Sequence, residues 1–447
     1  MLFNSLQYAV FLPIVFALYW IVPHKQRWIV VLASSYFFYM SWNVKYLLLI
    51  IFITGVSFAG ALLIEGENNK KKKKIKLGIV VCVTLALLFI FKFIGFLGQI
   101  VVAILNMSSI PTSELVLNIL LPVGISFYTF QAIGYIVDVY RGDAKAEHHI
   151  GIYAAYISFF PQLIAGPIGR AKSLLPQIKN ERYFDYEQAT YGLKLMAWGF
   201  FKKIVIADTL AVYVDMVYDD IHYCSGFARL LAIFFFSIQI YCDFSGYSDI
   251  ARGTSKLLGI DLMENFKSPY FSASIKEFWR RWHISLSSWF RDYVYIPLGG
   301  NRVSKFRNSL NLMITFLLSG LWHGTSWTFV TWGGLHGGAQ IAEKMVSGGK
   351  DKEKKHKLPY AIRVCITFLA VSALWTFFRA KRIKDAGYML IYWYYNINHP
   401  IQWITAGCEN LGIDIWIALK LLIMIVLLAV FDYLSLKRDV ILTISKW

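Results

Sequence analysis

Charged residues and cysteines are both scarce in this chain of 447 residues. Only 16% of the residues are charged and 57% are hydrophobic, whereas soluble domains have about 25% charged and about 45 to 50% apolar residues. A soluble fold cannot bury so much apolar surface and is therefore excluded. The five cysteines are widely spaced and form no C-x-x-C pair: Cys82, Cys224, Cys242, Cys365 and Cys408. We therefore expect neither a disulfide framework nor a metal site.

Several familiar catalytic motifs are also missing. The chain has no P-loop, no G-x-S-x-G elbow, no H-E-x-x-H and no dinucleotide glycine pattern. Nucleotide hydrolysis and serine-elbow esterase chemistry are thus poor candidates. Acidic residues number 27 against 45 Lys plus Arg, a net charge of +18. Because the basic residues cluster between apolar runs, they indicate cytoplasmic loops and lipid headgroups rather than nucleic acid.

Long apolar stretches fill most of the chain. The first stretch has neither the basic region nor the cleavage site of a signal peptide, so we expect it to be retained as the first transmembrane helix. About 20 apolar residues cross a bilayer, and a backbone in lipid must satisfy its own hydrogen bonds. We predict an all-α polytopic membrane protein with about 11 transmembrane helices plus re-entrant and interfacial helices. Residues 1–447 are expected to form a single integral membrane domain. The loop at 66–76, with its lysine run, is expected in the cytoplasm.

The longest break in hydrophobicity, at residues 245–308, is expected to be an embedded or interfacial catalytic segment. Ser274 and Glu277 form a capping-box pattern, which predicts a helix running to residue 293. One face of this helix would carry Trp279, His283, Leu286 and Phe290. Burial there favours a neutral His283, the form that can act as a general base. A core histidine bonded to a carbonyl, or an interfacial aromatic belt, would explain the same pattern.

A second histidine, His323, lies between two apolar stretches in the sequence SGLWHGTSW. Intramembrane histidines are rare and functional by default, and the flanking Gly320 and Gly324 would admit a ligand or another helix. Ordinary small-residue helix packing is the alternative. His336 follows at an angle of about 220° if the stretch is one unbroken helix, so we expect it to be structural. For the same reason Asp243 and Asp249, about 240° apart, are not expected to be a matched acid/base pair.

Several ordered motifs resemble those of one protein family. The stretches EFWRRWHISLSSWFRDYVYIPLGGNR at 277–302 and SGLWHGTSWTFVTWGGLHG at 319–337 resemble the signature of the membrane-bound O-acyltransferase family. Shorter stretches are similar to the branch that contains alginate and related bacterial polysaccharide O-acetyltransferases. These are GISFYTFQAIGYIVDVYRG at 124–142, FPQLIAGPI at 160–168, QIYCDFSGYSDIARG at 239–253 and WTFFRA at 375–380. The resemblance covers most of the chain.

The resemblance implies a ring of helices around a central funnel in a bacterial cytoplasmic membrane. It also implies acyl transfer, by preference acetyl, from a cytoplasmic acyl coenzyme A to an extracytoplasmic polysaccharide. The acceptor would be reached directly or through a periplasmic or extracellular acetyltransferase partner, and no cofactor would be tightly bound. The stretch 298–302, LGGNR, resembles the acetylating branch more than the D-alanylating one. Transfer of D-alanyl or another acyl group remains the alternative within the family.

The resemblance places the catalytic positions at His323 and His283. His323 is the preferred general base for the acceptor hydroxyl, and His283 would orient the donor or stabilise the tetrahedral intermediate. Candidate substrate-binding residues are Arg280, Arg281, Arg291, Arg302, Trp282 and Trp322. The four guanidinium groups would hold coenzyme A phosphates, with contact to lipid headgroups as the alternative. Outside this family, a secondary transporter or a non-catalytic export scaffold would also have many spans, although no paired broken-helix repeats are found.

Overall fold

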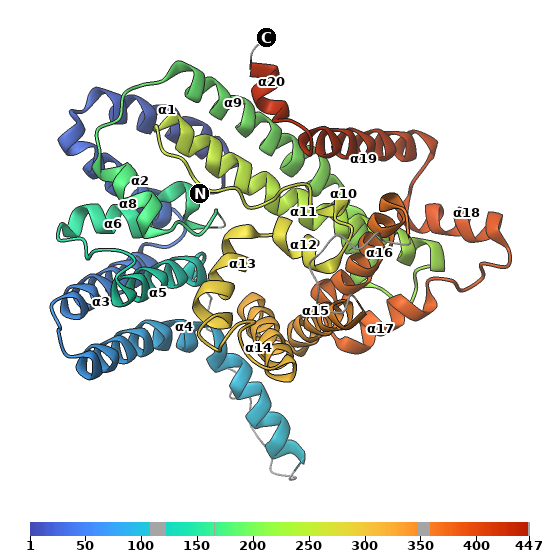
Figure 1. Cartoon of the computed structure of the whole chain (residues 1–447). Helices are drawn as coiled ribbons and strands as arrows, with labels where there is room; N and C mark the ends of the chain where they lie inside the picture. Colours follow the sequence, from blue (N-terminus) through green and yellow to red (C-terminus); the bar gives the residue numbers. More distant parts are fainter. Residues whose placement is uncertain (108–121, 165, 347–357, 446–447) are drawn as a thin grey trace. The chain divides into compact units, whose positions relative to one another are not determined.

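The computed structural model describes residues 1–107, 122–164, 166–346 and 358–445, and the regular structure in these ranges is helical throughout (Figure 1). The predicted all-α fold class is confirmed. The chain forms two compact units, one of Met1–Met196 with Ile250–Met263, and one of Ala197–Asp249 with Glu264–Trp447.

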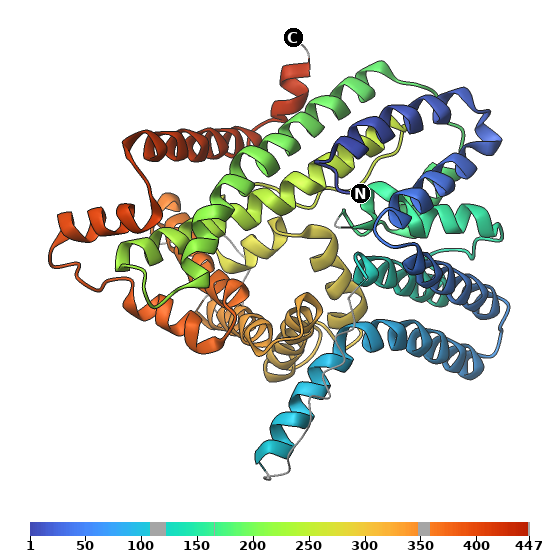
Figure 2. The same ribbon diagram turned by 180° about the vertical axis from the view of Figure 1, so that it is seen from behind.

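The first unit is built from the amino-terminal helices. They are α1 (Leu6–Ile21), η1 (His24–Gln26), α2 (Arg27–Met40), η2 (Val44–Tyr46), α3 (Leu47–Glu65), α4 (Lys70–Met107), α5 (Ile125–Arg141), α6 (Ile150–Ser158), α7 (Phe160–Leu163), α8 (Ala171–Lys179) and most of α9 (Tyr186–Phe200). Helices α3, α4 and α5 pack against one another, as the blue and blue-green ribbons of Figure 2 show. The apolar stretch at 160–168 is not one continuous helix: α7 ends at Leu163 and α8 begins at Ala171, while Ala165 lies outside the described residues.

The start of α4 corrects one prediction. The lysine run Lys70 to Lys74 is not part of a loop but forms the first turns of α4, and only residues 66–69 connect it to α3. The side chain of Asn69 accepts hydrogen bonds from the amides of Lys71 and Lys72, at 2.9 and 3.2 Å. Such a cap satisfies amides that have no partner within the helix, and this is why the helix can begin inside the charged run.

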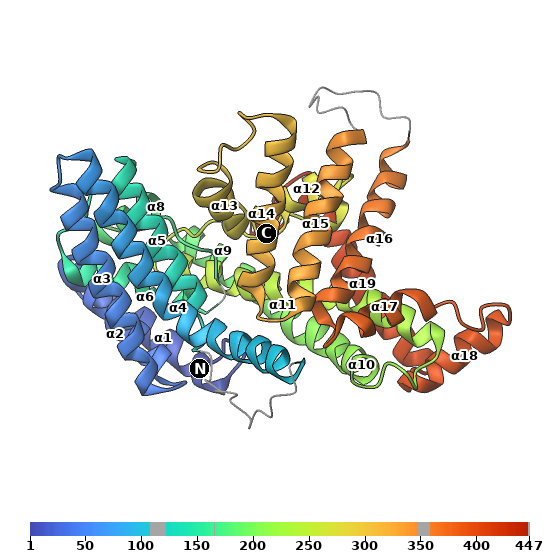
Figure 3. The same ribbon diagram turned by 90° about the horizontal axis from the view of Figure 1, so that it is seen from below.

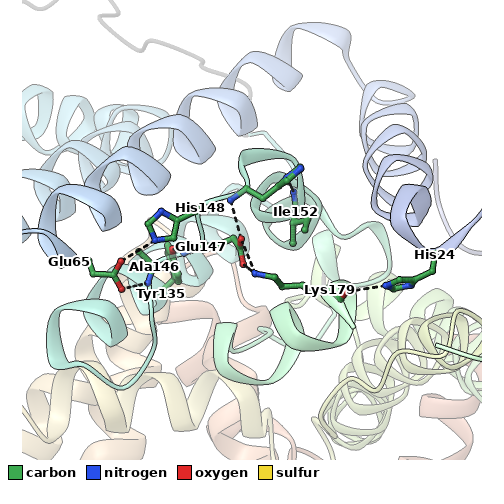
Figure 4. Close-up of polar contacts among 9 residues, drawn as sticks. His24, Glu65, Tyr135, Ala146, Glu147, His148, Ile152 and Lys179 are labelled. Atoms are coloured by element: carbon green, nitrogen blue, oxygen red, sulfur yellow. Dashed lines mark hydrogen bonds and ion pairs between the residues drawn. The ribbon is translucent and has the colours of Figure 1, made fainter. Parts of the chain in front are cut away.

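A group of polar contacts ties the segment between α5 and α6 to its neighbours (Figure 4). The carboxylate of Glu65, at the end of α3, accepts a hydrogen bond of 2.8 Å from the amide of Ala146. The buried Glu147 pairs with Lys179 of α8 at 3.2 Å, and its amide donates to the hydroxyl of Tyr135. These contacts link α3, α5 and α8 through the short connection between α5 and α6.

The second unit contains the end of α9 and the remaining helices. They are η3 (Phe201–Ala207), α10 (Asp208–Asp219), most of α11 (Gly226–Leu257), η4 (Pro269–Phe271), α12 (Ile275–Arg281), α13 (Ile284–Phe290), η5 (Arg291–Tyr295), α14 (Lys305–His323), α15 (Trp327–Val346), α16 (Tyr360–Arg379), α17 (Ile383–Tyr392), α18 (Pro400–Leu411), α19 (Ile415–Ser435) and α20 (Val440–Ser445). Helices α14 and α15 lie side by side, and α12 and α16 both pack on α15 (Figure 3).

Five helical stretches in the described residues are long and apolar enough to cross a membrane. They are Val44–Glu65, Lys70–Gly98, Gly226–Leu257, Tyr360–Arg379 and Ile415–Ser435. In the last of these, a row of large apolar side chains is exposed: Leu419, Leu422, Ile423, Val426, Leu427 and Val430. Water would not tolerate such a row on one helix, whereas lipid would. The predicted number of about 11 spans stays a prediction.

Candidate functional site

The helix predicted to run through His283 is broken at that residue. Helix α12 ends at Arg281 and α13 begins at Ile284, and His283 between them has a left-handed backbone with φ 43°. The continuous helix to residue 293 is therefore a wrong prediction, although its start is right. Ser274 caps α12 by accepting from the amide of Glu277 at 3.1 Å, and the Glu277 carboxylate returns to the amide of Ala273.

The break is held by Asn265, which sequence reasoning missed. The carbonyl oxygen of Asn265 accepts from the amide of Ile284 at 2.9 Å, and its side-chain oxygen accepts from the amide of Ser285 at 3.2 Å. These amides belong to the first turn of α13, where a continuous helix would have bonded them to α12. Asn265 lies in a segment without periodicity, and its role could not have been found from spacing.

His283 is buried as predicted, even though the helix is broken. Its side chain is 1% exposed, with the ring of Phe244 at a centroid distance of 4.7 Å and that of Phe266 at 6.2 Å. Because burial disfavours the imidazolium, the pKa of His283 falls from its usual 6.5 to about 3. The imidazole is therefore neutral at physiological pH, as expected.

His323 is the last residue of α14, and its side chain is partly exposed. The neighbouring glycines serve helix packing. A Cβ atom on Gly320 would lie 2.3 Å from the carbonyl oxygen of Phe329, and one on Gly324 would lie 2.1 Å from the Phe329 ring. The lack of a side chain at both glycines lets Phe329 of α15 come close. Helix packing, the alternative to ligand binding, is therefore enough to explain these glycines.

The two candidate catalytic histidines lie on the same indole. The ring of Trp322 is 6.3 Å from that of His283 and 4.8 Å from that of His323, both measured between centroids. Trp322 is 8% exposed, so the indole that contacts both imidazoles is itself buried. His283, just before α13, and His323, at the end of α14, thus contact the same side chain although they are about 40 positions apart in the sequence.

His336 and His323 contact the same indole, that of Trp332, although rotation along one unbroken helix predicted that they point apart. That argument assumed one unbroken helix, but the helix ends at His323 and α15 begins at Trp327. The Trp332 ring lies 5.1 Å from His323 and 5.1 Å from His336, again between centroids. The angular offset of about 220° therefore does not separate the two imidazoles. His336 is fully buried.

The candidate arginines are mostly on the surface. Arg280 and Arg302 are exposed. Arg281 pairs with Glu277 at 2.6 Å, and Arg291, with its side chain 63% exposed, pairs with Asp292 at 2.8 Å. A phosphate bound by these last two would have to compete with a neighbouring carboxylate. In contrast, Trp282 is buried, and its ring packs on Phe266, Phe278 and Trp375.

Two lysines that the sequence did not single out form ion pairs beside this site, one of them, Lys202 with Asp249, largely buried and the other, Lys203 with Asp243, partly exposed. They lie in the π-helical turn η3, a rare conformation that is frequent at functional sites. Lys202 Nζ is 2.6 Å from Asp249 Oδ2, and Lys203 Nζ is 2.6 Å from Asp243 Oδ1. The two carboxylates thus bind different lysines.

Comparison with known proteins identifies the family. The model of MBOAT, the membrane-bound O-acyltransferase family, matches residues 147–378, a range that contains both His283 and His323. The chain is 41% identical over 384 residues to the probable alginate O-acetylase AlgI of Pseudomonas syringae, covering 85% of this chain and 72% of that protein. It is 36% identical over 421 residues to the peptidoglycan O-acetyltransferase of Helicobacter pylori, covering 86% and 78%.

A third relative belongs to a different branch. The teichoic acid D-alanyltransferase of Streptococcus thermophilus is 32% identical over 280 residues, which cover 56% of this chain and 66% of that protein. Taken together, these matches show that the chain belongs to the membrane-bound O-acyltransferase family. It is an O-acyltransferase, and the transporter and scaffold alternatives lose their support.

Proposed function

We propose that this protein transfers an acetyl group from cytoplasmic acetyl coenzyme A to hydroxyl groups of a cell-surface polysaccharide. The observation that carries the proposal is the placement of two histidines from separate helices on one indole, that of Trp322. The relatives with the longer matches act, by their names, on alginate and peptidoglycan. The D-alanyltransferase match covers less of the chain, which favours acetyl over D-alanyl transfer.

In the proposed mechanism His323 is the general base. Its side chain is partly exposed and is therefore more accessible to an acceptor hydroxyl than that of His283, which is buried. A neutral imidazole takes the proton of the acceptor hydroxyl as the oxygen attacks the thioester carbonyl. The C–S bond then breaks, the new ester keeps the acyl group, and the proton passes to the departing thiolate. His283, held neutral, orients the donor or donates to the oxyanion of the intermediate.

The remaining parts of the proposal concern binding and the membrane. Arg280, Arg281, Arg291 and Arg302 carry the charge that coenzyme A phosphates require, Trp282 directly follows α12, and Trp322 lies in α14 beside His323. We propose that about 11 helices form a ring around a funnel in a bacterial cytoplasmic membrane, with the acceptor on the far side. The acceptor is modified directly or through an extracytoplasmic partner acetyltransferase.

The test is acetyl transfer by the purified protein with radiolabelled acetyl coenzyme A and an isolated polysaccharide. His323→Ala should lower the rate by at least about 100-fold, because general-base help contributes about 10² to 10⁴. His283→Ala should also be severely impaired. His399→Ala, at an exposed histidine of the same unit, should keep the wild-type rate. A His323→Ala protein that is folded and transfers acetyl at the wild-type rate would refute the mechanism.

A further inference from the structure

A hydrogen bond ties the helix that leads into His283 to α15. The indole Nε1 of Trp279, in α12, donates to Nδ1 of His336 at 3.2 Å, and both side chains are buried. An indole nitrogen can only donate, so Nδ1 of His336 must carry a lone pair and the neutral ring holds its hydrogen on Nε2. Trp279 precedes His283 by one helical turn, and the bond therefore fixes the end of α12 from which His283 departs.

A second contact of His336 connects it to His323 through the ring of Trp332. Trp332 and His336 are one turn apart on α15 and therefore share a face of that helix. The Trp332 ring lies 5.1 Å from His336 and 5.1 Å from His323. Ring packing of this kind is weakly directional, whereas the bond from Trp279 is directional. His336 thus makes two contacts: a directional hydrogen bond with Trp279, which precedes His283, and ring packing with Trp332, which also contacts His323.

We infer that His336 is a positioning residue, which sets the placement of His283 relative to His323 through its bond with Trp279. This inference rests on the proposed function, in which both histidines act on one reacting group. A displacement of about 1 Å far from the chemistry can lower a rate about 100-fold. A buried histidine that served packing alone would instead contribute to stability, and its loss would not alter turnover per folded molecule.

The experiment compares variants that differ in this one bond. His336→Leu keeps an apolar side chain of similar bulk but removes the acceptor. His336→Asn replaces Nδ1 with an amide oxygen in nearly the same place, and Trp279→Phe removes the donor. Rates with radiolabelled acetyl coenzyme A are measured per folded molecule, with kcat and KM determined separately. The double variant, Trp279→Phe with His336→Leu, tests whether both changes act through the same contact.

We expect kcat to fall tenfold or more in His336→Leu and in Trp279→Phe, with KM nearly unchanged. The double variant should be no slower than either single one, and His336→Asn should recover most of the wild-type kcat. A wild-type kcat in folded His336→Leu, additive losses in the double variant, or an Asn variant as slow as the Leu variant would each overturn the inference.

A second measurement separates this inference from the proposed function. If the wild-type protein transfers no acetyl group, the proposed function fails, and positioning is then tested by chemical modification. Diethyl pyrocarbonate reacts with accessible imidazoles, and mass spectrometry gives its rate at the partly exposed His323. We expect His336→Leu to change that rate at least threefold and His336→Asn to restore it. Equal rates in all three proteins would overturn the inference.

Discussion

The backbone of His283 is held in a region that few residues adopt. A non-glycine residue with positive φ costs free energy, of the order of 1 to 3 kcal/mol, and persists only where its surroundings impose it. Here the imposition comes from Asn265, which occupies the first two amides of α13. The left-handed turn directs the imidazole toward Phe244, Phe266 and Trp322 in place of the direction that a helical residue would take.

Burial of this imidazole makes stability depend on pH. The pKa of His283 is about 3 in the folded protein and 6.5 in an unfolded chain, so below pH 6.5 the unfolded state binds the extra proton. The stabilisation is complete above pH 6.5 and is lost as the pH falls toward 3. At pH 5 the loss amounts to about 2 kcal/mol.

We predict that acid destabilises the wild-type protein more than a His283→Asn variant. Asn tolerates positive φ and does not titrate, so it removes the linkage while keeping the turn. Thermal unfolding in detergent at pH 7.5 and pH 5 measures the change of Tm with pH. Subtracting the change of the variant from that of the wild type removes the contribution of the other titrating groups. Equal losses of Tm in the two proteins would show that His283 is not buried as a neutral ring.

At this scale the sequence predicted burial and charge but not geometry. Burial of Trp279, His283, Leu286 and Phe290 was predicted correctly, but the rings beside His283 are those of Phe244, Phe266 and Trp322, which the spacing did not indicate. The break itself was not predictable, because it depends on Asn265, which is 18 residues away and bonds through space. The same limit applied to His336, whose distance from His323 was judged by rotation within one helix.

Helices α14 and α15 approach each other closely because glycines face glycines. A Cβ atom on Gly333 would lie 2.4 Å from the carbonyl oxygen of Phe316 and 3.3 Å from Cα of Gly320. Contact with backbone cannot be relieved by turning a side chain, so a larger residue has to push the helices apart. This crossing also sets the separation of His323 at the end of α14 from Trp332 on α15.

We predict that Gly333→Ala destabilises the protein by about 1 to 3 kcal/mol. The matched control is Gly338→Ala on the same helix, where an added Cβ would meet no atom within 4 Å. That variant should be neutral or up to about 1 kcal/mol more stable, because alanine favours a helix over glycine. Thermal unfolding of both in detergent tests the difference, and a similar Tm for the two variants would contradict a close crossing.

At the scale of elements, periodicity located helices better than it located their ends. The capping residue Ser274 was recognisable because its partner Glu277 is only three residues away. The helical start at Lys70 was not recognisable, because a run of lysines suggests a loop. The hydrogen bonds from Asn69 that offset the repulsion between these lysines form only in the folded turn. The ion pairs of the π-helical turn η3 were not predictable either, because their carboxylates, Asp243 and Asp249, are on another helix.

For the whole molecule, hydropathy excluded a soluble protein, while the number of about 11 spans stays a prediction. Five described stretches meet the length and apolar criteria, against about 11 predicted spans. The difference arises where apolar windows contain polar residues or end early, as in α1, which has 16 residues and Pro13 in its interior. Such helices need partners to cross a bilayer, and a sequence window does not show partners.

We predict that the connection before α4 faces the cytoplasm. The lysines Lys70 to Lys74 resist translocation, and Lys76 is already neutralised by Glu67 at 2.9 Å. Asn68 is exposed and does not cap the helix, so Asn68→Cys in a cysteine-free background reports on the location without disturbing α4. An impermeant maleimide should label it only in permeabilised cells, and labelling in intact cells would place the connection outside.

The pairing of Lys202 with Asp249 also constrains how the protein is made. The two residues are 47 positions apart, so the lysine leaves the ribosome several seconds before the carboxylate that neutralises it, at about 5 to 20 residues per second. An unpaired lysine costs about 2.5 to 3.5 kcal/mol at the centre of an inserting helix. Until α11 has been synthesised, Lys202 therefore lacks the carboxylate that it pairs with in the fold, and η3 can take up its final packing only together with α11.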